Sequence, residues 1–228
     1  MSAVAGNLKR VQDRIAAACS AAGRAPSEVK LVAVCKTFPA SAVREAFGLG
    51  QTDFGENRFQ EADLKMRELT DLRLNWHFLG QVQSNKLHRI LRVFSMVQSL
   101  DRTEIIEKAE RVLGEGGEKR DGLIEVNISG EESKAGFTPK EFRELLGSGA
   151  LHRLKSLNVR GLMGIGPLTE RSDRVRSSFD LLKTLYEEGR SQGLAWDTLS
   201  MGMSSDLEPA IAAGSTMVRV GTAVFGTR

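Results

Sequence analysis

The sequence predicts a (β/α)8 barrel, in which eight parallel strands alternate with helices and close into a cylinder. Short apolar or β-branched runs recur eight times, and seven helical patterns separate them, as in the βαβ units of a parallel sheet. Eight such units in about 200 residues fit the low end of the usual size of this barrel. A doubly wound open sheet is the competing architecture, but no G-x-G-x-x-G follows the first strand to support its dinucleotide-binding form.

The N-terminal segment, residues 1–25, precedes this alternation and is expected to form an extra amphipathic helix. Its apolar residues recur at helical spacing, namely Leu8, Val11, Ile15, Cys19 and Ala22. The barrel is expected over residues 29–226. Because no low-complexity linker or composition break divides the chain, we predict a single domain over residues 1–228.

The expected strands share short apolar runs bounded by turn-forming residues. They are 29–36, 52–57, 75–80, 95–101, 122–129, 159–166, 197–202 and 217–226. The helical patterns between them share apolar residues at three- and four-residue spacing. They are 39–50, 58–69, 84–94, 102–115, 138–150, 173–190 and 204–214.

Several helix starts have local causes. Pro39 suits an early helical position, where a missing N–H costs little. Thr138 is an N-cap candidate followed by Pro139. Ser205 precedes Glu208 by three residues, which is the pattern of a capping box for the last crossover helix.

Composition excludes several classes of function. The chain has 32 Lys and Arg against 29 Asp and Glu, a net charge of +3 that is too small to indicate a nucleic-acid partner. Its two cysteines, Cys19 and Cys35, make neither a disulfide framework nor a metal set, and we expect no metal site. We find no signal-peptide pattern and no apolar stretch of membrane-spanning length, and therefore expect a cytoplasmic protein.

The run VKLVAVCKTFP, residues 29–39, places a lysine where the first strand ends. We expect Lys36 to be the last residue of this strand and to share a face with Val32 and Val34. The carboxyl ends of barrel strands form the active-site face. A lysine there is partly shielded from water, which favours the neutral amine that Schiff-base formation requires. A strand-end lysine in solvent is the alternative interpretation.

The second half of the chain supplies a candidate anion site. After the seventh strand, Ser200, Gly202, Ser204 and Ser205 lead into a helix, and backbone N–H groups of small residues at such a point bind anions. The eighth strand adds a further set, Arg219, Gly221 and Thr222. Barrels frequently bind phosphate after strands seven and eight, and strand eight adjoins strand one. An amine beside a phosphate site indicates a phosphorylated carbonyl compound as ligand.

Six segments together resemble the pyridoxal phosphate homeostasis proteins. They are VAVCKTFP, FGENRFQEA, WHFLGQVQSNK, VNISGEESKAGF, GLMGIGP and LSMGMSSDLEPAIAAGSTMVRVGTAVFG, which span nearly the whole chain in order. The resemblance implies a barrel like the N-terminal domain of alanine racemases. It further implies that pyridoxal 5′-phosphate is held as a covalent imine on Lys36.

The resemblance also assigns the remaining cofactor contacts. It implies that the phosphate is bound by Ser200, Gly202, Gly221 and Thr222. It places Arg219 beside either the pyridine nitrogen or the phosphate.

Two further residues, Asn57 and His77, fall at strand ends in motifs like those of the family and are expected to line the pocket. For His77, a hydrogen-bonded histidine in the barrel is the alternative.

We expect a non-catalytic protein that binds pyridoxal phosphate in vitamin B6 homeostasis and delivers it to apo-enzymes that need it. A monomer is expected, because no apolar element is left over for an interface. Two alternatives stay open. One is a pyridoxal-phosphate-dependent amino-acid racemase, and the other is a Schiff-base aldolase for a phosphorylated carbonyl substrate.

Overall fold

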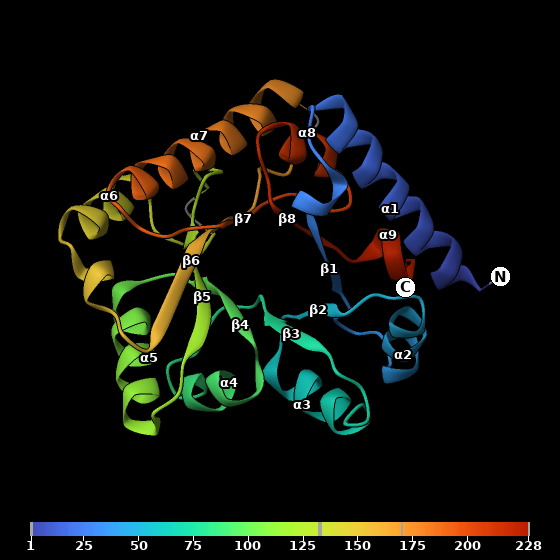
Figure 1. Cartoon of the computed structure of the whole chain (residues 1–228), viewed down its shortest axis with the longest axis horizontal. Helices are drawn as coiled ribbons and strands as arrows, with labels where there is room; N and C mark the ends of the chain where they lie inside the picture. The colour runs from blue at the N-terminus through green and yellow to red at the C-terminus, as the bar shows by residue number, and fades with distance from the viewer. Residues whose placement is uncertain (1, 132–133, 170, 228) are drawn as a thin grey trace.

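The computed structural model describes residues 2–131, 134–169 and 171–227, and it shows the expected closed barrel (Figure 1). The parallel strands pair in chain order, and the first also pairs with the last, so that Lys30 faces Met217 and Ala33 faces Val220. The strands are β1 (Lys30–Val34), β2 (Asp53–Glu56), β3 (Asn75–Phe78), β4 (Met96–Leu100), β5 (Arg120–Val126), β6 (Leu157–Gly164), β7 (Thr198–Ser200) and β8 (Met217–Val220). The fold class predicted from the sequence is therefore confirmed.

Helices surround the barrel and connect its strands. They are α1 (Ala3–Ala21), α2 (Ala40–Gly48), α3 (Phe59–Arg67), α4 (Leu87–Val93), α5 (Thr103–Gly116), α6 (Pro139–Gly147), α7 (Ser172–Ser191), α8 (Leu207–Ala212) and α9 (Thr222–Phe225). Short 3-10 helices lie at Pro26–Glu28 and Ala150–Arg153. The extra N-terminal helix predicted from the sequence is α1.

Helix α1 packs along α8 and α9, on the outer side of the barrel near its last strand (Figure 1). The Asn7 side-chain amide donates to the Val224 carbonyl oxygen at 3.1 Å. The Arg14 guanidinium donates to both carboxylate oxygens of Glu208, at 2.6 and 2.8 Å. These contacts tie the N-terminal helix to the segments that follow β7 and β8.

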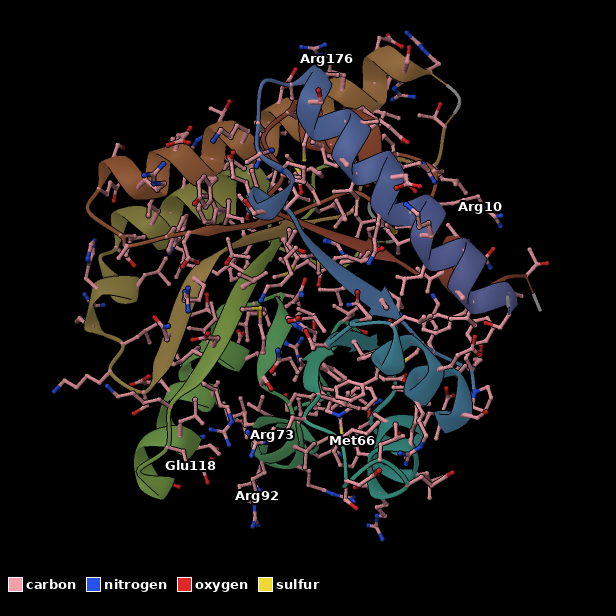
Figure 2. The ribbon with its side chains drawn as sticks, turned by 45° about the vertical axis from the view of Figure 1, so that its right-hand side comes forward. Arg10, Met66, Arg73, Arg92, Glu118 and Arg176 are labelled. Carbon is pink, nitrogen blue, oxygen red and sulfur yellow. The ribbon has the colours of Figure 1, made fainter. Side chains whose placement is uncertain are left out.

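The apolar core has two layers. The larger one lies between the strands and the surrounding helices. A smaller cluster fills the barrel interior and consists of Val32, Met96, Leu123, Met163 and Met217. Side chains alternate across a strand, so the next inward-pointing residue of each strand comes two positions further along the chain. It therefore lies closer to the mouth, where the carboxyl ends of the strands meet. Long charged side chains such as Arg10 and Arg176 point outward from the helices (Figure 2).

Every strand ends one to six residues before its expected end, and two of these differences bear on the site. Strand β1 ends at Val34, so Lys36 lies in the following turn and not at the end of the strand. Strand β8 ends at Val220, and the segment expected to continue it forms α9. In both places the chain leaves the sheet earlier than its apolar pattern indicates.

The helix caps confirm one prediction and correct two. Thr138 caps α6 in a capping box with Glu141, and Pro139 begins that helix. Pro39 is the N-cap of α2 and not a residue of its first turn. Helix α8 begins after Asp206, so Ser205 does not cap it.

Within the described ranges, no helix combines the length and apolar character that crossing a bilayer requires. Among the same residues, no group of three or more His, Cys, Asp or Glu side chains is placed to hold a metal ion.

Candidate cofactor site at the barrel mouth

A pocket of about 330 Å³ opens at the carboxyl-end mouth of the barrel. Its polar lining comes from segments that follow β1, β2 and β7 and from the end of β8 onward. These residues are Lys36, Asn57, Ser204, Ser205, Arg219, Gly221 and Thr222. The apolar wall consists of Val34, Leu79, Met163, Ile165 and Met203. Because β1 pairs with β8, the pocket joins residues from both halves of the chain.

Lys36 lies in a turn between β1 and α2, and its side chain is exposed rather than partly shielded as expected. The turn is closed by the N–H of Phe38, which donates to the Cys35 carbonyl oxygen at 3.1 Å. Thr37, the next residue after the lysine, has a φ of +67°, in the left-handed region that β-branched residues rarely adopt. The turn thus carries the amine beyond the strand and over the edge of the pocket.

Asn57 follows β2 directly and is held against the end of β3. A Cβ atom on Gly80 would lie 1.9 Å from the Asn57 carbonyl oxygen, so only glycine permits this approach. The close contact fixes the backbone from which Asn57 reaches the pocket.

Three hydroxyl groups gather on the side of the pocket formed by the segments after β7 and β8. Thr222 donates from Oγ1 to the Ser204 Oγ at 3.2 Å, which brings the two segments together. Arg14 of α1 donates to the Ser204 carbonyl oxygen at 3.0 Å. With Ser205 alongside, this hydroxyl group cluster (Ser204, Ser205 and Thr222) is suited to an anionic ligand such as a phosphate.

Arg219 enters the pocket from β8, and only 5% of its surface is exposed. Its guanidinium donates from Nη1 to the Ser200 Oγ at 2.6 Å and from Nη2 to the Gly164 carbonyl oxygen at 3.0 Å. Burial lowers the pKa of Arg219 to about 10, against the opposing effect of Glu125 and Asp206. It therefore stays protonated and presents a fixed positive charge to the pocket.

A row of buried hydrogen bonds continues from Arg219 into the barrel. The Ser200 hydroxyl donates to the Gln98 Oε1 at 2.7 Å, and the Gln98 amide nitrogen lies 3.0 Å from the His77 Nδ1. The His77 Nε2 lies 3.0 Å from the Asp53 Oδ1. Since the Gln98 nitrogen can only donate, His77 accepts at Nδ1 and donates at Nε2.

Asp53 ends this row on the far side from the mouth. Its burial would raise its pKa, but the hydrogen bond from His77 and the charge of Lys30 outweigh burial and lower the pKa to about 2. Asp53 is therefore ionised at neutral pH, and its carboxylate accepts the last hydrogen bond of the row, from His77.

Five of the eight cofactor-binding residues expected from the sequence line the pocket, namely Lys36, Asn57, Arg219, Gly221 and Thr222. Three others do not. Ser200 and His77 belong to the buried row below Arg219, as the alternative for His77 described.

Gly202 instead serves the backbone. Its carbonyl oxygen accepts from the Arg219 N–H at 2.9 Å. Its φ of +97° suits glycine, and a Cβ atom on Gly202 would lie only 2.6 Å from the Ala210 Cβ.

Ser204 and Ser205 line the pocket but were not among the eight expected cofactor-binding residues, although the candidate anion site predicted from the sequence contains both. Glu125 was also missed. It sits on β5 with 7% of its surface exposed. Burial, helped by the charge of Asp101 and opposed by Arg219, raises its pKa to about 7.

Glu125 should make the stability of the protein fall as pH rises. Its pKa in the folded state lies above the reference value of 4.5, so the stability it contributes is full below pH 4.5 and is lost through about pH 7. We expect Glu125→Gln to match the parent at pH 4.5 and to exceed its unfolding free energy by up to about 3 kcal/mol at pH 8. Urea unfolding at both pH values measures this, with Glu115→Gln on the exposed face of α5 as the control. A constant difference across pH would contradict the assignment.

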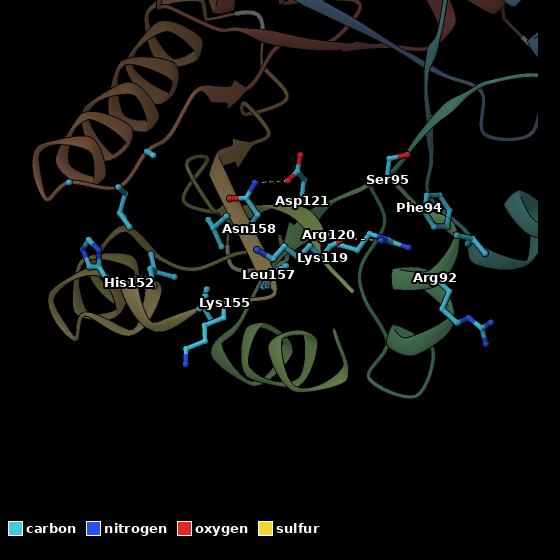
Figure 3. Close-up of a pocket in the computed structure, with 17 residues that line it drawn as sticks. Arg92, Phe94, Ser95, Lys119, Arg120, Asp121, His152, Lys155, Leu157 and Asn158 are labelled. Atoms are coloured by element: carbon cyan, nitrogen blue, oxygen red, sulfur yellow. Dashed lines mark hydrogen bonds between the residues drawn. The ribbon is translucent and has the colours of Figure 1, made fainter. Parts of the chain in front are cut away.

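A larger cavity, about 780 Å³, lies at the opposite end of the barrel, beside the starts of β5 and β6 (Figure 3). Figure 3 shows two of its basic side chains, Arg92 and Lys155, pointing away from the cavity and from each other, and a third, Arg120, donates to the Leu91 carbonyl oxygen. Its carboxylate, Asp121, is bonded to Asn158 and Arg160. The arrangement offers a ligand no concentrated charge, and the mouth is the better candidate site.

Comparison with known proteins identifies several relatives. Residues 6–228 match the family model described as alanine racemase, N-terminal domain. The pyridoxal phosphate homeostasis protein of Pseudomonas aeruginosa is 46% identical, over 100% of this chain and 97% of that protein. The protein of the same name from Escherichia coli K12 is 43% identical, over 100% of this chain and 98% of that protein.

Solved structures agree with these matches. PipY of Synechococcus elongatus with PLP bound has a TM-score of 0.83 at 39% identity, covering 95% of this chain and 100% of that one. The alanine racemase of Clostridium difficile has a TM-score of 0.74 at 14% identity, covering 98% of this chain and 57% of that one. At 14% identity the likeness concerns the fold alone.

Proposed function

Because the chain belongs to the pyridoxal phosphate homeostasis protein family, we propose that it binds pyridoxal 5′-phosphate at the barrel mouth for vitamin B6 homeostasis. One observation supports this most directly. A lysine amine, a cluster of hydroxyl groups and a buried arginine line the same pocket. The cofactor carries an aldehyde, a phosphate and a pyridine ring, and each has a chemically suited partner there.

In this proposal Lys36 condenses with the cofactor aldehyde, releasing one water, and holds it as a Schiff base. The hydroxyl group cluster and the backbone at Gly221 bind the phosphate. Arg219 is more deeply buried than the cluster, so we assign it to the ring nitrogen. When bound, the cofactor supplies an electron sink, and a permanently charged guanidinium beside the nitrogen weakens that sink.

Absorbance spectroscopy tests the proposal. The purified protein incubated with pyridoxal phosphate should turn yellow and bleach with borohydride, and mass spectrometry should locate the reduced adduct on Lys36. A protein that stays colourless yet forms a borohydride-trapped adduct with a phosphorylated sugar would favour the aldolase.

We further propose that the protein is not a racemase. Racemisation needs a proton acceptor on each face of the cofactor, and Lys36 can serve one. The sole tyrosine of the sequence, Tyr186, cannot serve the other from where it lies. It is 4% exposed on α7, and its hydroxyl donates to the Trp196 carbonyl oxygen at 3.0 Å.

We therefore expect no exchange of the α-proton of L- or D-alanine at an enzyme-like rate in heavy water. Mass spectrometry of the recovered alanine and its optical purity measure this, with Lys36→Ala as background. Rapid exchange that depends on Lys36 and is accompanied by loss of optical purity would establish the racemase instead.

Delivery of the cofactor to apo-enzymes, a monomeric state and a cytoplasmic location complete the proposal. The exposed position of Lys36 supports delivery, because an acceptor amine can approach the Schiff base without opening the barrel. Transfer is tested by the recovery of activity of an apo-enzyme mixed with the loaded protein, and the monomer by sedimentation.

A further inference from the structure

The turn that carries Lys36 is held from behind by a buried ion pair. Lys65 of α3 pairs with Glu56 at the end of β2, and their side chains are only 7% and 0% exposed. The Lys65 Nζ also donates to the Cys35 carbonyl oxygen at 2.7 Å. The Cys35 thiol in turn donates to the Glu56 Oε1 at 3.2 Å. Lys65 and Glu56 thus hydrogen-bond to the carbonyl group and the side chain of Cys35, the residue before Lys36.

The pair is poorly explained as a source of stability. Removing two charges from water is costly, and such pairs can often be replaced by apolar residues without loss. The second carboxylate oxygen of Glu56, Oε2, is buried and has no hydrogen-bond partner among the described residues. The role of the pair is better explained by the third group that it holds, the Cys35 carbonyl, to which Lys65 donates.

The Cys35 carbonyl is the first group of the turn that contains Lys36, and this turn is strained. It accepts the closing bond from the Phe38 N–H at 3.1 Å. Thr37 is the only non-glycine residue with a positive φ in the parts of the chain that the structure describes. The left-handed conformation is unfavourable for a β-branched residue, so the turn needs support from elsewhere. A charged donor on its first carbonyl is such a support.

We propose that Lys65, through the Cys35 carbonyl and its pairing with Glu56, is the positioning residue that holds the strained turn and keeps the Lys36 amine over the pocket. Glu56 also immediately precedes Asn57, which lines the same pocket. The purpose of the positioning rests on the proposed function, but the positioning itself can be measured without cofactor.

The test uses the double variant Glu56→Leu with Lys65→Met, which removes both charges and leaves neither buried alone. Lys65→Met by itself would strand the Glu56 carboxylate and could prevent folding. A surface double variant, Arg143→Gln with Glu188→Gln, removes an exposed ion pair between α6 and α7 and serves as the control. Circular dichroism and thermal unfolding establish that each variant is folded.

The first measurement needs no cofactor. Amide hydrogen exchange at Phe38 reports the bond that closes the turn, and we expect faster exchange in the Glu56→Leu/Lys65→Met variant alone. The second is the rate at which pyridoxal phosphate attaches to Lys36. We expect this rate to fall about tenfold, because the free-energy cost of one residue in the left-handed conformation corresponds to about that factor in rate. Binding of pyridoxine 5′-phosphate, which has the phosphate but no aldehyde, should be unchanged.

A rescue separates positioning from a general structural role. Thr37→Gly removes the strain, because glycine adopts positive φ freely. Added to the double variant, it should restore most of the lost attachment rate, while Thr37→Gly alone should stay near the parent.

Several results would overturn the proposal. These are unchanged Phe38 exchange, an unchanged attachment rate, no rescue by glycine, or an equal loss of pyridoxine 5′-phosphate binding. If the apolar pair does not fold, Glu56→Gln with Lys65→Met carries the same expectations, and failure of both to fold would show a purely structural role. Absence of any adduct on Lys36 in the parent protein would instead refute the proposed function, while Phe38 exchange would still decide the positioning.

Discussion

Lys36→Ala is expected to abolish covalent attachment of pyridoxal phosphate and to leave the fold intact. The side chain is exposed and lies in a turn, so its removal creates no buried cavity, and the unfolding free energy should change by no more than about 0.5 kcal/mol. Non-covalent binding through the hydroxyl group cluster should persist at reduced affinity. Absorbance before and after borohydride, with mass spectrometry of the adduct, measures the loss.

Lys140→Ala is the matched control, since that lysine is 87% exposed on α6, which lies across the barrel from β1 and β8 (Figure 1). The competing amine near the mouth is Lys134, which is engaged with Glu131 and with the Gly166 carbonyl oxygen. A reduced adduct found in the parent protein on Lys134, or on Lys86 at the start of α4, would refute the assignment of Lys36.

Arg219→Glu is expected to weaken cofactor retention more than any other single change in the pocket apart from loss of Lys36. A charged hydrogen bond is worth about 1.5–3 kcal/mol, which is one to two decades in affinity. The reversal also places a carboxylate beside Glu125 and Asp206, the two acids whose charges act on Arg219. Breaking such a buried arrangement typically costs about 3–5 kcal/mol of stability.

Because that cost could prevent folding, Arg219→Gln is the informative companion, and equilibrium dialysis with pyridoxal phosphate measures retention in both. Ser200→Ala is a second comparison, since it removes the 2.6 Å hydrogen bond that holds the Arg219 guanidinium and leaves the residues of the pocket lining unchanged. Unchanged affinity in a folded Arg219→Gln variant would mean that the guanidinium does not face the cofactor.

The fold could be predicted because its signal is local and repeated. Alternating apolar runs and helical stripes depend on the two residue periods alone, and the eight strands were all found. The end of β1 could not be placed in the same way. The chain leaves the sheet after Val34, and what holds the turn that follows is Lys65, thirty residues further along. No local pattern contains that contact.

The site was predicted in part for a related reason. The strand period tells which residues point inward but not how deep they lie. Ser200 and Arg219 both face the interior, yet only Arg219 reaches the pocket, because its side chain is long enough. Glu125 could not be found from sequence at all, since nothing around it on β5 indicates that it faces an arginine from β8.

The pairing of β1 with β8 has a consequence for how the protein is made. Lys36 and the segment from Arg219 to Thr222 meet only when the last strand docks against the first. A nascent chain whose final strand is still inside the ribosome has the amine but not the phosphate side of the pocket. Folding intermediates with an open barrel are in the same position. Under the proposed function, capture of the cofactor therefore follows the docking of β8 against β1, and the appearance of its colour would time this closing step of folding.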